Sequence, residues 1–72
     1  MSLLEQLKII WEEILETNEI NISDNFFDLG GDSFSALEIS LKSKEIGISL
    51  SVGKIFELQT IEKIVKTMDQ NS

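Results

Sequence analysis

The apolar residues at the start of the chain recur at steps of three and four, and this spacing constrains the fold more than any other feature. The two overlapping series are Leu3, Leu7, Ile10, Ile14 and Leu4, Leu7, Trp11, Leu15. Such steps place apolar side chains on one face of an α-helix and leave the charged residues between them on the other. We therefore predict a helix over residues 3–15 that buries this face, Trp11 included, in a core.

A long loop follows the first predicted helix. Residues 17–32 lose the helical period and are rich in Asn, Asp and Gly, which is typical of a loop. Connections longer than about 12–15 residues are usually functional or disordered, and the apolar residues within this one favour an ordered, functional loop. A short helical turn near residues 24–27, capped by Ser23, is expected inside it.

Three further helices are expected, at residues 33–45, 52–58 and 61–68. Asp32 or Ser33 can cap the start of the first of these. Gly47 can end it, and Thr60 can cap the last. The chain is thus predicted to be all-α, a four-helix bundle with a short third helix and a long loop between helices 1 and 2.

The length of 72 residues predicts one domain, residues 1–72, with a core at about 3–68 and a polar tail at 69–72 that frays. Large apolar residues are more often core than surface. On that basis the residues expected in the core are Phe26, Phe27, Leu29, Leu37, Leu41 and Phe56. Phe34 follows Ser33 directly at the start of a helix, so we expect it to be partly exposed.

Composition excludes several classes of function. The chain has no Cys and no His, which removes disulfides, thiolate metal sites, cysteine nucleophiles and imidazole bases. The net charge of −7 argues against nucleic-acid and membrane-surface binding, and residues 1–32 hold eight acids beside one lysine. No apolar run is long enough for a membrane span, and the N-terminus lacks a signal-peptide pattern. We therefore expect a cytoplasmic monomer whose partners are proteins.

The block from Asp24 to Ser33 reads Asp-Asn-Phe-Phe-Asp-Leu-Gly-Gly-Asp-Ser and presents a serine hydroxyl at a helix start after a glycine-rich turn. Gly30 and Gly31 allow backbone angles that other residues avoid and leave room for another macromolecule to approach. The positive dipole end of a helix favours negative charge at such a position. The block therefore suits a phosphate-linked modification of Ser33.

Three other interpretations of this block are weaker. A serine hydrolase needs a base, normally histidine, and the pattern Gly-x-Ser-x-Gly fails because Ser35 stands at its last place. A calcium loop could use Asp24, Asp28 and Asp32, but the EF-hand order of ligands and glycine is missing, so we expect no metal site. The third interpretation is a plain helix cap with no further role.

The same run resembles the core motif of phosphopantetheine-binding carrier domains, in particular the peptidyl carrier (thiolation) domains of nonribosomal peptide synthetases. The resemblance covers about residues 3–68, because Ala36-Leu37, the segment 48–51 and the segment 55–61 follow in the order and spacing of that family. The Gly-Gly pair is more similar to peptidyl carriers than to fatty-acid acyl carriers. Phe34 departs from the smaller aliphatic residue that is usual in the family.

The resemblance implies a bundle of the acyl carrier type that catalyses nothing itself. A phosphopantetheinyl transferase would attach a 4′-phosphopantetheine arm from coenzyme A to Ser33, with Asp32 and Gly31 at the attachment site. The arm would hold an aminoacyl, peptidyl or acyl group as a thioester and present it to adenylation, condensation or other biosynthetic enzymes. The residues implied to contact these partners are Phe34, Val52 and Phe56.

Two alternatives stay open from the sequence. One is a polyketide-type acyl carrier protein, since the Gly-Gly pair only favours the peptidyl type. The other is an unmodified acidic helical module that binds a protein partner and needs no reactive serine at position 33.

Overall fold

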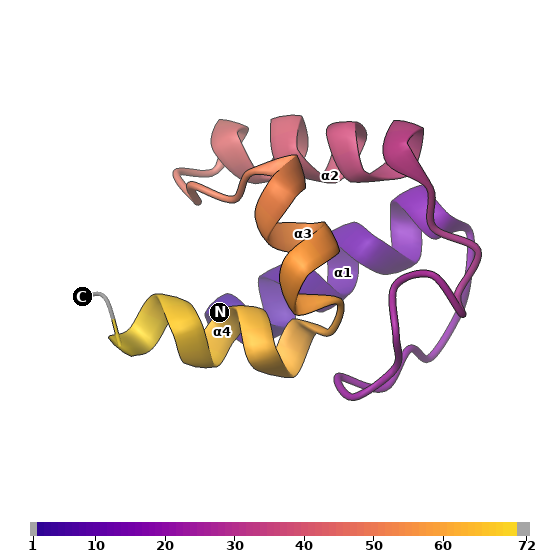
Figure 1. The fold of residues 1–72 in the computed structure, drawn as a ribbon, viewed down its shortest axis with the longest axis horizontal. Helices are drawn as coiled ribbons and strands as arrows, with labels where there is room; N and C mark the ends of the chain where they lie inside the picture. Colours follow the sequence, from indigo (N-terminus) through magenta and orange to yellow (C-terminus); the bar gives the residue numbers. More distant parts are fainter. Residues whose placement is uncertain (1, 71–72) are drawn as a thin grey trace.

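The computed structural model describes residues 2–70 and contains four helices in that range: α1 Leu3–Leu15, α2 Ser33–Glu45, α3 Val52–Leu58 and α4 Ile61–Gln70. In Figure 1, α2 runs along the top, α1 and α4 lie below it, and the short α3 crosses between these layers. The predicted all-α fold, with its short third helix and its long loop between helices 1 and 2, is confirmed. None of the helices in residues 2–70 is long and apolar enough to cross a bilayer.

Hydroxyl side chains begin three of the helices. Each accepts a hydrogen bond from a backbone amide of the first turn, which would otherwise lack an intrahelical partner. The pairs are Ser2 Oγ with Glu5 N at 3.2 Å, Ser51 Oγ with Lys54 N at 3.1 Å and Thr60 Oγ1 with Lys63 N at 3.2 Å. The predicted cap at Thr60 is therefore present.

The core lies where the four helices and the long loop meet. Its fully buried large side chains are Leu7, Trp11, Ile20, Phe26, Ile39, Ile55, Ile61 and Ile64. The ring of Trp11 meets the ring of Phe26 edge to face, with 5.3 Å between the ring centroids. Trp11 and Phe26 thus belong to the core, as the sequence predicts.

The loop between α1 and α2 is tied to the bundle along its length. Ile20 and Phe26 of this loop are buried. Its three anchoring bonds run from Ile20 N to Glu12 Oε2 at 3.0 Å, from Glu62 N to Ile22 O at 3.0 Å and from Phe26 N to Gln59 O at 2.7 Å. The expectation of an ordered loop agrees with these contacts.

The turn inside this loop begins later than the sequence predicts. Asn25, not Ser23, caps it: Asn25 Oδ1 accepts from Phe27 N at 2.9 Å, and Leu29 N donates to Asn25 O at 3.1 Å. Asp24 is already used in a preceding turn, in which its carboxylate accepts from Asn21 N at 3.0 Å. Two consecutive turns therefore replace the single one expected.

The end of α4 also differs from the prediction. The helix continues through Asp69 to Gln70, two residues into the segment expected to be a fraying polar tail. Met68 is partly buried against the core and holds the last turn in place. The remaining tail residues, Asn71 and Ser72, lie outside the described residues.

The orientation of α2 corrects the prediction of its core residues. Its buried residues are Ala36, Ile39 and Ser43, which we call the inner face. The outer face consists of Phe34, Leu37 and Leu41, which are 74%, 49% and 56% exposed. The expectation that Leu37 and Leu41 are core is wrong, because two small residues on the inner face let α2 lie close to its neighbours.

Phe27 is also expected in the core from the sequence and is instead 44% exposed. The other two, Leu29 and Phe56, are partly buried against the core. Phe27 follows Phe26 directly in the turn, and Phe26 takes the buried position. The pair therefore divides between inside and outside.

Candidate functional site

Ser33 is the first residue of α2, and a reciprocal pair of hydrogen bonds fixes its position. Asp32 Oδ1 accepts from Ser35 N at 2.9 Å and from Ser35 Oγ at 2.7 Å, while Asp32 N donates to Ser35 Oγ at 3.2 Å. This arrangement satisfies an orphan amide at the helix start. Ser33 lies inside it with an exposed side chain, and no hydrogen bond within residues 2–70 holds its hydroxyl.

The turn before Ser33 is built around Phe26. A Cβ atom on Gly31 would lie 2.5 Å from Cζ of Phe26, so only glycine fits against this buried ring. Gly31 N also donates to Phe26 O at 3.0 Å. Gly30 has a φ of 90°, the left-handed region that glycine tolerates best. The core thus sets the path of the chain into α2.

The two glycines therefore act for different reasons. The sequence suggests unusual backbone angles at both, yet only Gly30 has a positive φ. Gly31 is required by the space that Phe26 occupies. Both requirements hold the exposed hydroxyl of Ser33 at the end of the molecule where α2 begins.

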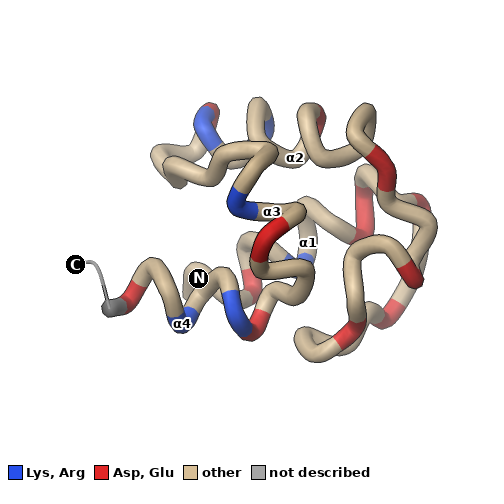
Figure 2. The backbone as a smooth tube through the Cα atoms, in the orientation of Figure 1, with Lys and Arg blue, Asp and Glu red and all other residues tan. Residues whose placement is uncertain are grey.

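Acidic groups surround this end of the molecule. Figure 2 shows acidic residues along the long loop and at the start of α2. The hydrogen bond from the Ser35 amide, helped by that from the Ser35 hydroxyl, holds the pKa of Asp32 below its usual value of 3.8. Asp32 is therefore a carboxylate at neutral pH, directly beside Ser33. Such a surface attracts a basic patch on another protein.

Ser33 has no activating group of its own. Serine nucleophiles need an adjacent base to take the hydroxyl proton. The chain contains no His, and the carboxylate of Asp32 is used by Ser35. Ser33 is consequently an acceptor for a reaction that another protein must catalyse.

The aspartates of the loop do not assemble into a metal site. Asp24 accepts from the amide of Asn21, and Asp32 accepts from Ser35. Within the part of the chain that the structure describes, no three potential ligands of the His, Cys, Asp or Glu type come together. The calcium-loop interpretation therefore finds no support in the geometry.

The predicted partner contacts form two neighbouring groups. Phe34, on the outer face of α2, is the more exposed, whereas Val52 and Phe56 of α3 are partly buried. The ring of Phe56 stacks on that of Phe27, with 5.5 Å between centroids and 24° between planes. A surface aromatic pair thus links the loop to α3.

Sequence reasoning missed three surface residues as candidates for partner contact: Phe27, Leu37 and Leu41. The available signal was the second helical series in α2, formed by Ala36, Ile39 and Ser43, which gives a closely packing face without the larger residues. Large exposed apolar residues next to a functional group are typical of interaction surfaces.

Comparison with known families gives the chain a family. Residues 5–68 match the model of the family described as "Phosphopantetheine attachment site". The matched range contains all of the long loop, Ser33 and helices α2 and α3. A domain of this family carries a 4′-phosphopantetheine attachment site and is not itself catalytic.

The most similar proteins include components of peptide synthetases. The chain is 36% identical over 67 residues to a protein of the linear gramicidin synthase of Brevibacillus parabrevis, which covers 93% of the chain and 1% of that protein. It is 44% identical over 60 residues to a protein of the plipastatin synthase of Bacillus subtilis strain 168, which covers 83% of the chain and 2% of that protein. The chain thus spans only a few per cent of the length of these relatives.

Solved structures agree with this assignment. The crystal structure of holo T3CT superposes with a TM-score of 0.83 and 31% identity, covering 88% of this chain and 93% of that one. BlmI, a type-II acyl carrier protein from Streptomyces verticillus, has the same fold, with a TM-score of 0.83 at 22% identity over 94% of this chain and 83% of that one. The chain therefore belongs to the phosphopantetheine attachment-site family and is a carrier protein related to the thiolation domains of nonribosomal peptide synthetases.

Proposed function

We propose that Ser33 is the residue that carries the phosphopantetheine arm, and that residues 1–72 are a single carrier domain with its core at about 3–68. The observation that carries this proposal is the unengaged, exposed hydroxyl of Ser33 at the start of α2, inside the range that matches the family. Asp32 and Gly31 complete the proposed attachment site. Asp32 fixes the helix start, and Gly31 fixes the preceding turn.

The residues present fit this group. A phosphodiester on Ser33 would lie at the positive dipole end of a helix of 13 residues, which favours its negative charge. The side chain is exposed, so an enzyme can reach it. When bound, the group would supply a thiol that holds an acyl group as a thioester.

Ser33 has one chemical role in the attachment. Its Oγ forms the bond to phosphorus, the phosphoanhydride of coenzyme A breaks, and 3′,5′-ADP leaves with the electron pair. The proton of the hydroxyl goes to a base on the phosphopantetheinyl transferase, because this chain has no histidine to take it.

The outer face of α2 and the Phe27–Phe56 pair are the proposed contacts with partner enzymes. Phe34 lies next to Ser33 and is largely exposed, so a transferase that reaches Ser33 also meets this ring. Val52 and Phe56 of α3 extend the same surface. The acidic surroundings of Ser33 would attract basic groups on the partner and speed encounter.

The proposed setting is nonribosomal peptide biosynthesis, since the relatives include linear gramicidin and plipastatin synthases. In that setting the domain is a cytoplasmic monomer that presents an aminoacyl, peptidyl or acyl group to adenylation, condensation or related enzymes.

Intact-protein mass spectrometry tests the proposal. The chain is incubated with coenzyme A, magnesium and a broad-specificity phosphopantetheinyl transferase, and the modified peptide is mapped. We expect a gain of one phosphopantetheine group on Ser33. An unmodified, folded chain would instead identify a plain protein-binding module.

Two variants separate the site from the surrounding serines. Ser33→Ala is expected to abolish the mass gain while the helix content stays unchanged, because Asp32 and not Ser33 caps α2. Ser23→Ala is the matched control, since Ser23 is another serine of the loop outside the proposed site. Modification of Ser33→Ala, or its loss in Ser23→Ala, would contradict the assignment.

A further inference from the structure

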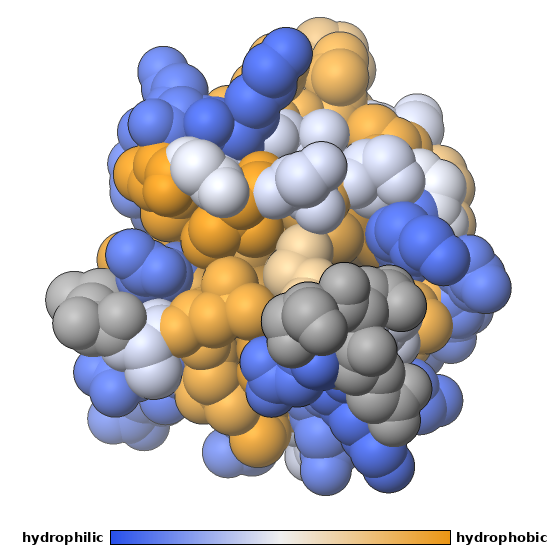
Figure 3. Space-filling view, turned by 90° about the vertical axis from the view of Figure 1, so that its left-hand side faces the viewer, coloured by the Kyte–Doolittle hydropathy of each residue, from blue (hydrophilic) through white to orange (hydrophobic). Residues whose placement is uncertain are grey.

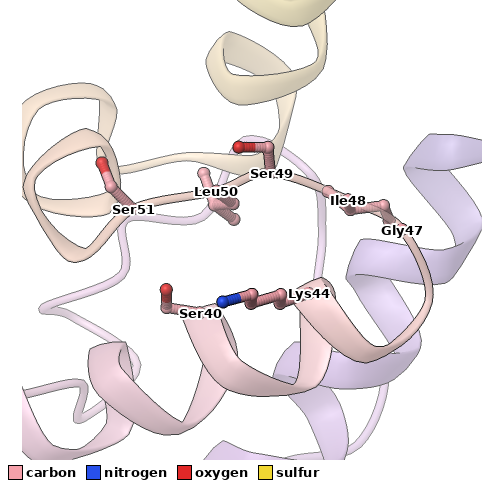
Figure 4. A pocket seen from close by; sticks show the side chains of 7 residues that line it. All are labelled: Ser40, Lys44, Gly47, Ile48, Ser49, Leu50 and Ser51. Atoms are coloured by element: carbon pink, nitrogen blue, oxygen red, sulfur yellow. The ribbon is translucent and has the colours of Figure 1, made fainter.

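An open cleft of about 480 Å³ lies between the second half of α2 and residues 47–51. Figure 3 looks onto the end of the molecule where α2 finishes and shows apolar surface between hydrophilic side chains. The cleft differs from that surface because polar groups line it. Figure 4 shows the side chain of Lys44 running along α2 toward Ser40, and Leu50 reaching toward them from the opposite segment.

The cleft lies on the same side of α2 as Ser33. Ser33, Leu37, Ser40 and Lys44 follow one another at steps of four, three and four. Residues at these steps share one face of a helix. From Ser33, the axial distance is about 10 Å to Ser40 and about 16 Å to Lys44, at 1.5 Å per residue.

The length of the arm matches this distance. About a dozen bonds join the phosphorus of phosphopantetheine to its sulfur, which corresponds to about four extended residues or about 15 Å. An arm that leaves Ser33 along this face reaches the span between Ser40 and Lys44 with its thiol. Leu37, half exposed, lies between them as an apolar support for the middle of the arm.

The polar groups of the cleft are hydrogen-bond donors without partners. Within residues 2–70, no carboxylate pairs with Lys44 and no hydrogen bond engages Ser40 Oγ, whereas Lys42 pairs with Glu13 at 3.7 Å and Lys54 with Glu57 at 3.4 Å. The third hydroxyl of the cleft, on Ser51, is already used to cap α3. An ammonium and a hydroxyl beside Leu50 attract a group with acceptor oxygens and negative charge, and repel an ammonium.

We propose that Ser40 and Lys44 form a cargo subsite for an acyl group that bears a carboxylate. Lys44 pairs with the carboxylate, and Ser40 donates to a carbonyl oxygen at the distal end of the arm. This inference rests on the proposed attachment at Ser33 and names the class of cargo that the domain holds best.

The test uses three cargoes of similar length on the full chain. A transferase attaches phosphopantetheine analogues in which a stable amide replaces the thioester, bearing succinyl, butyryl or 4-aminobutyryl groups. Mass spectrometry confirms attachment at Ser33, and two-dimensional ¹⁵N NMR follows the backbone amides. We expect the amides of residues 40–50 to shift most with succinyl and least with 4-aminobutyryl.

The expected preference is modest. An exposed ion pair favours the docked form of the succinyl arm over the butyryl arm by about two- to five-fold. Lys44→Gln is expected to remove this difference. Lys42→Gln is the matched control and is expected to keep it, because Lys42 lies outside the cleft and pairs with α1.

The possible results distinguish the two proposals. Complete attachment with shifts confined to residues near Ser33 would overturn the subsite alone. Equal shifts for the three cargoes, or a preference for succinyl that survives Lys44→Gln, would also overturn it. Absence of any mass gain at Ser33 would overturn the attachment and, with it, the subsite.

Discussion

The two faces of α2 contrast sharply in what they do with apolar side chains. The inner face is buried through Ala36, Ile39 and Ser43, while the outer face leaves three large apolar residues in solvent. A helix that served only the core would carry its large apolar residues inward. The outer face, next to Ser33, is therefore better explained by contacts with other proteins than by folding.

The largest effect expected from breaking this contrast is on the inner face. Ile39→Ala is expected to lower the free energy of unfolding by about 2–5 kcal/mol, because it leaves a cavity at a fully buried position. Urea denaturation followed by circular dichroism measures the change. Leu41→Ala is the control and should stay within about 0.5 kcal/mol of the parent, as at other exposed positions.

Since a domain of this size has little stability to lose, Ile39→Val serves as a milder variant. It is expected to reduce the free energy of unfolding by about 0.5–1.5 kcal/mol. Equal losses from Ile39→Val and Leu41→Ala would mean that the two faces do not differ in burial.

The turn that leads into α2 is the next place to test. Gly31→Ala is expected to lower the free energy of unfolding by about 1–3 kcal/mol, since the new Cβ overlaps the buried ring of Phe26. Gly53→Ala is the matched control, because a Cβ there has open space within α3. That control is expected to stabilise the chain by about 0.5–1 kcal/mol. A stable Gly31→Ala variant would contradict the close approach.

The outer face can be examined through its partner rather than through stability. Leu37→Ser and Leu41→Ser are expected to raise the KM of the chain as a transferase substrate by about five-fold or more if either is a central contact. The free energy of unfolding should change by no more than about 0.5 kcal/mol. Initial rates at varied carrier concentration measure the KM.

Lys66→Ser on α4 is the control for this experiment, because Lys66 is exposed on another helix. Its KM is expected to match that of the parent. An unchanged KM in both leucine variants would remove the outer face from the contact with the transferase.

The smallest effect concerns the charge of Asp32. Its pKa is lowered by the hydrogen bonds from Ser35, so the ionised group stabilises the fold above its ordinary pKa of 3.8. This contribution is lost as the pH falls through the lower pKa of the folded state. Asp32→Asn keeps the helix cap and removes the titration, so its unfolding free energy should fall less on acidification below about pH 4.

Asp28→Asn is the control for the acid experiment, since no hydrogen bond to its carboxylate occurs in residues 2–70. Urea denaturation at pH 7 and at pH 3 measures both variants. The two variants losing equal free energy on acidification would exclude Asp32 as a source of the pH dependence.

Features fixed by local chemistry were predictable from the sequence. The limits of α1, α2 and α3, the cap at Thr60 and the exposed position of Ser33 follow from periodicity, capping residues and glycines within a few positions. The run before Ser33 carried the resemblance to carrier domains, and the family match confirms it.

Features fixed by distant contacts were not predictable in this way. Whether Leu41 or Ile39 faces inward depends on how α2 lies against the other helices, and both residues fit a helical period. The role of Gly31 depends on the buried ring of Phe26, and the cleft at Lys44 depends on the path of residues 47–51. A single sequence gives residue types at these positions but not the contacts between them.

The most direct test of the central claim is the mass of the chain after incubation with coenzyme A and a phosphopantetheinyl transferase. We predict the addition of one phosphopantetheine group that maps to Ser33 and is absent in Ser33→Ala. An unmodified chain that remains folded, or a group that maps to another serine, would contradict the assignment of Ser33 as the attachment site.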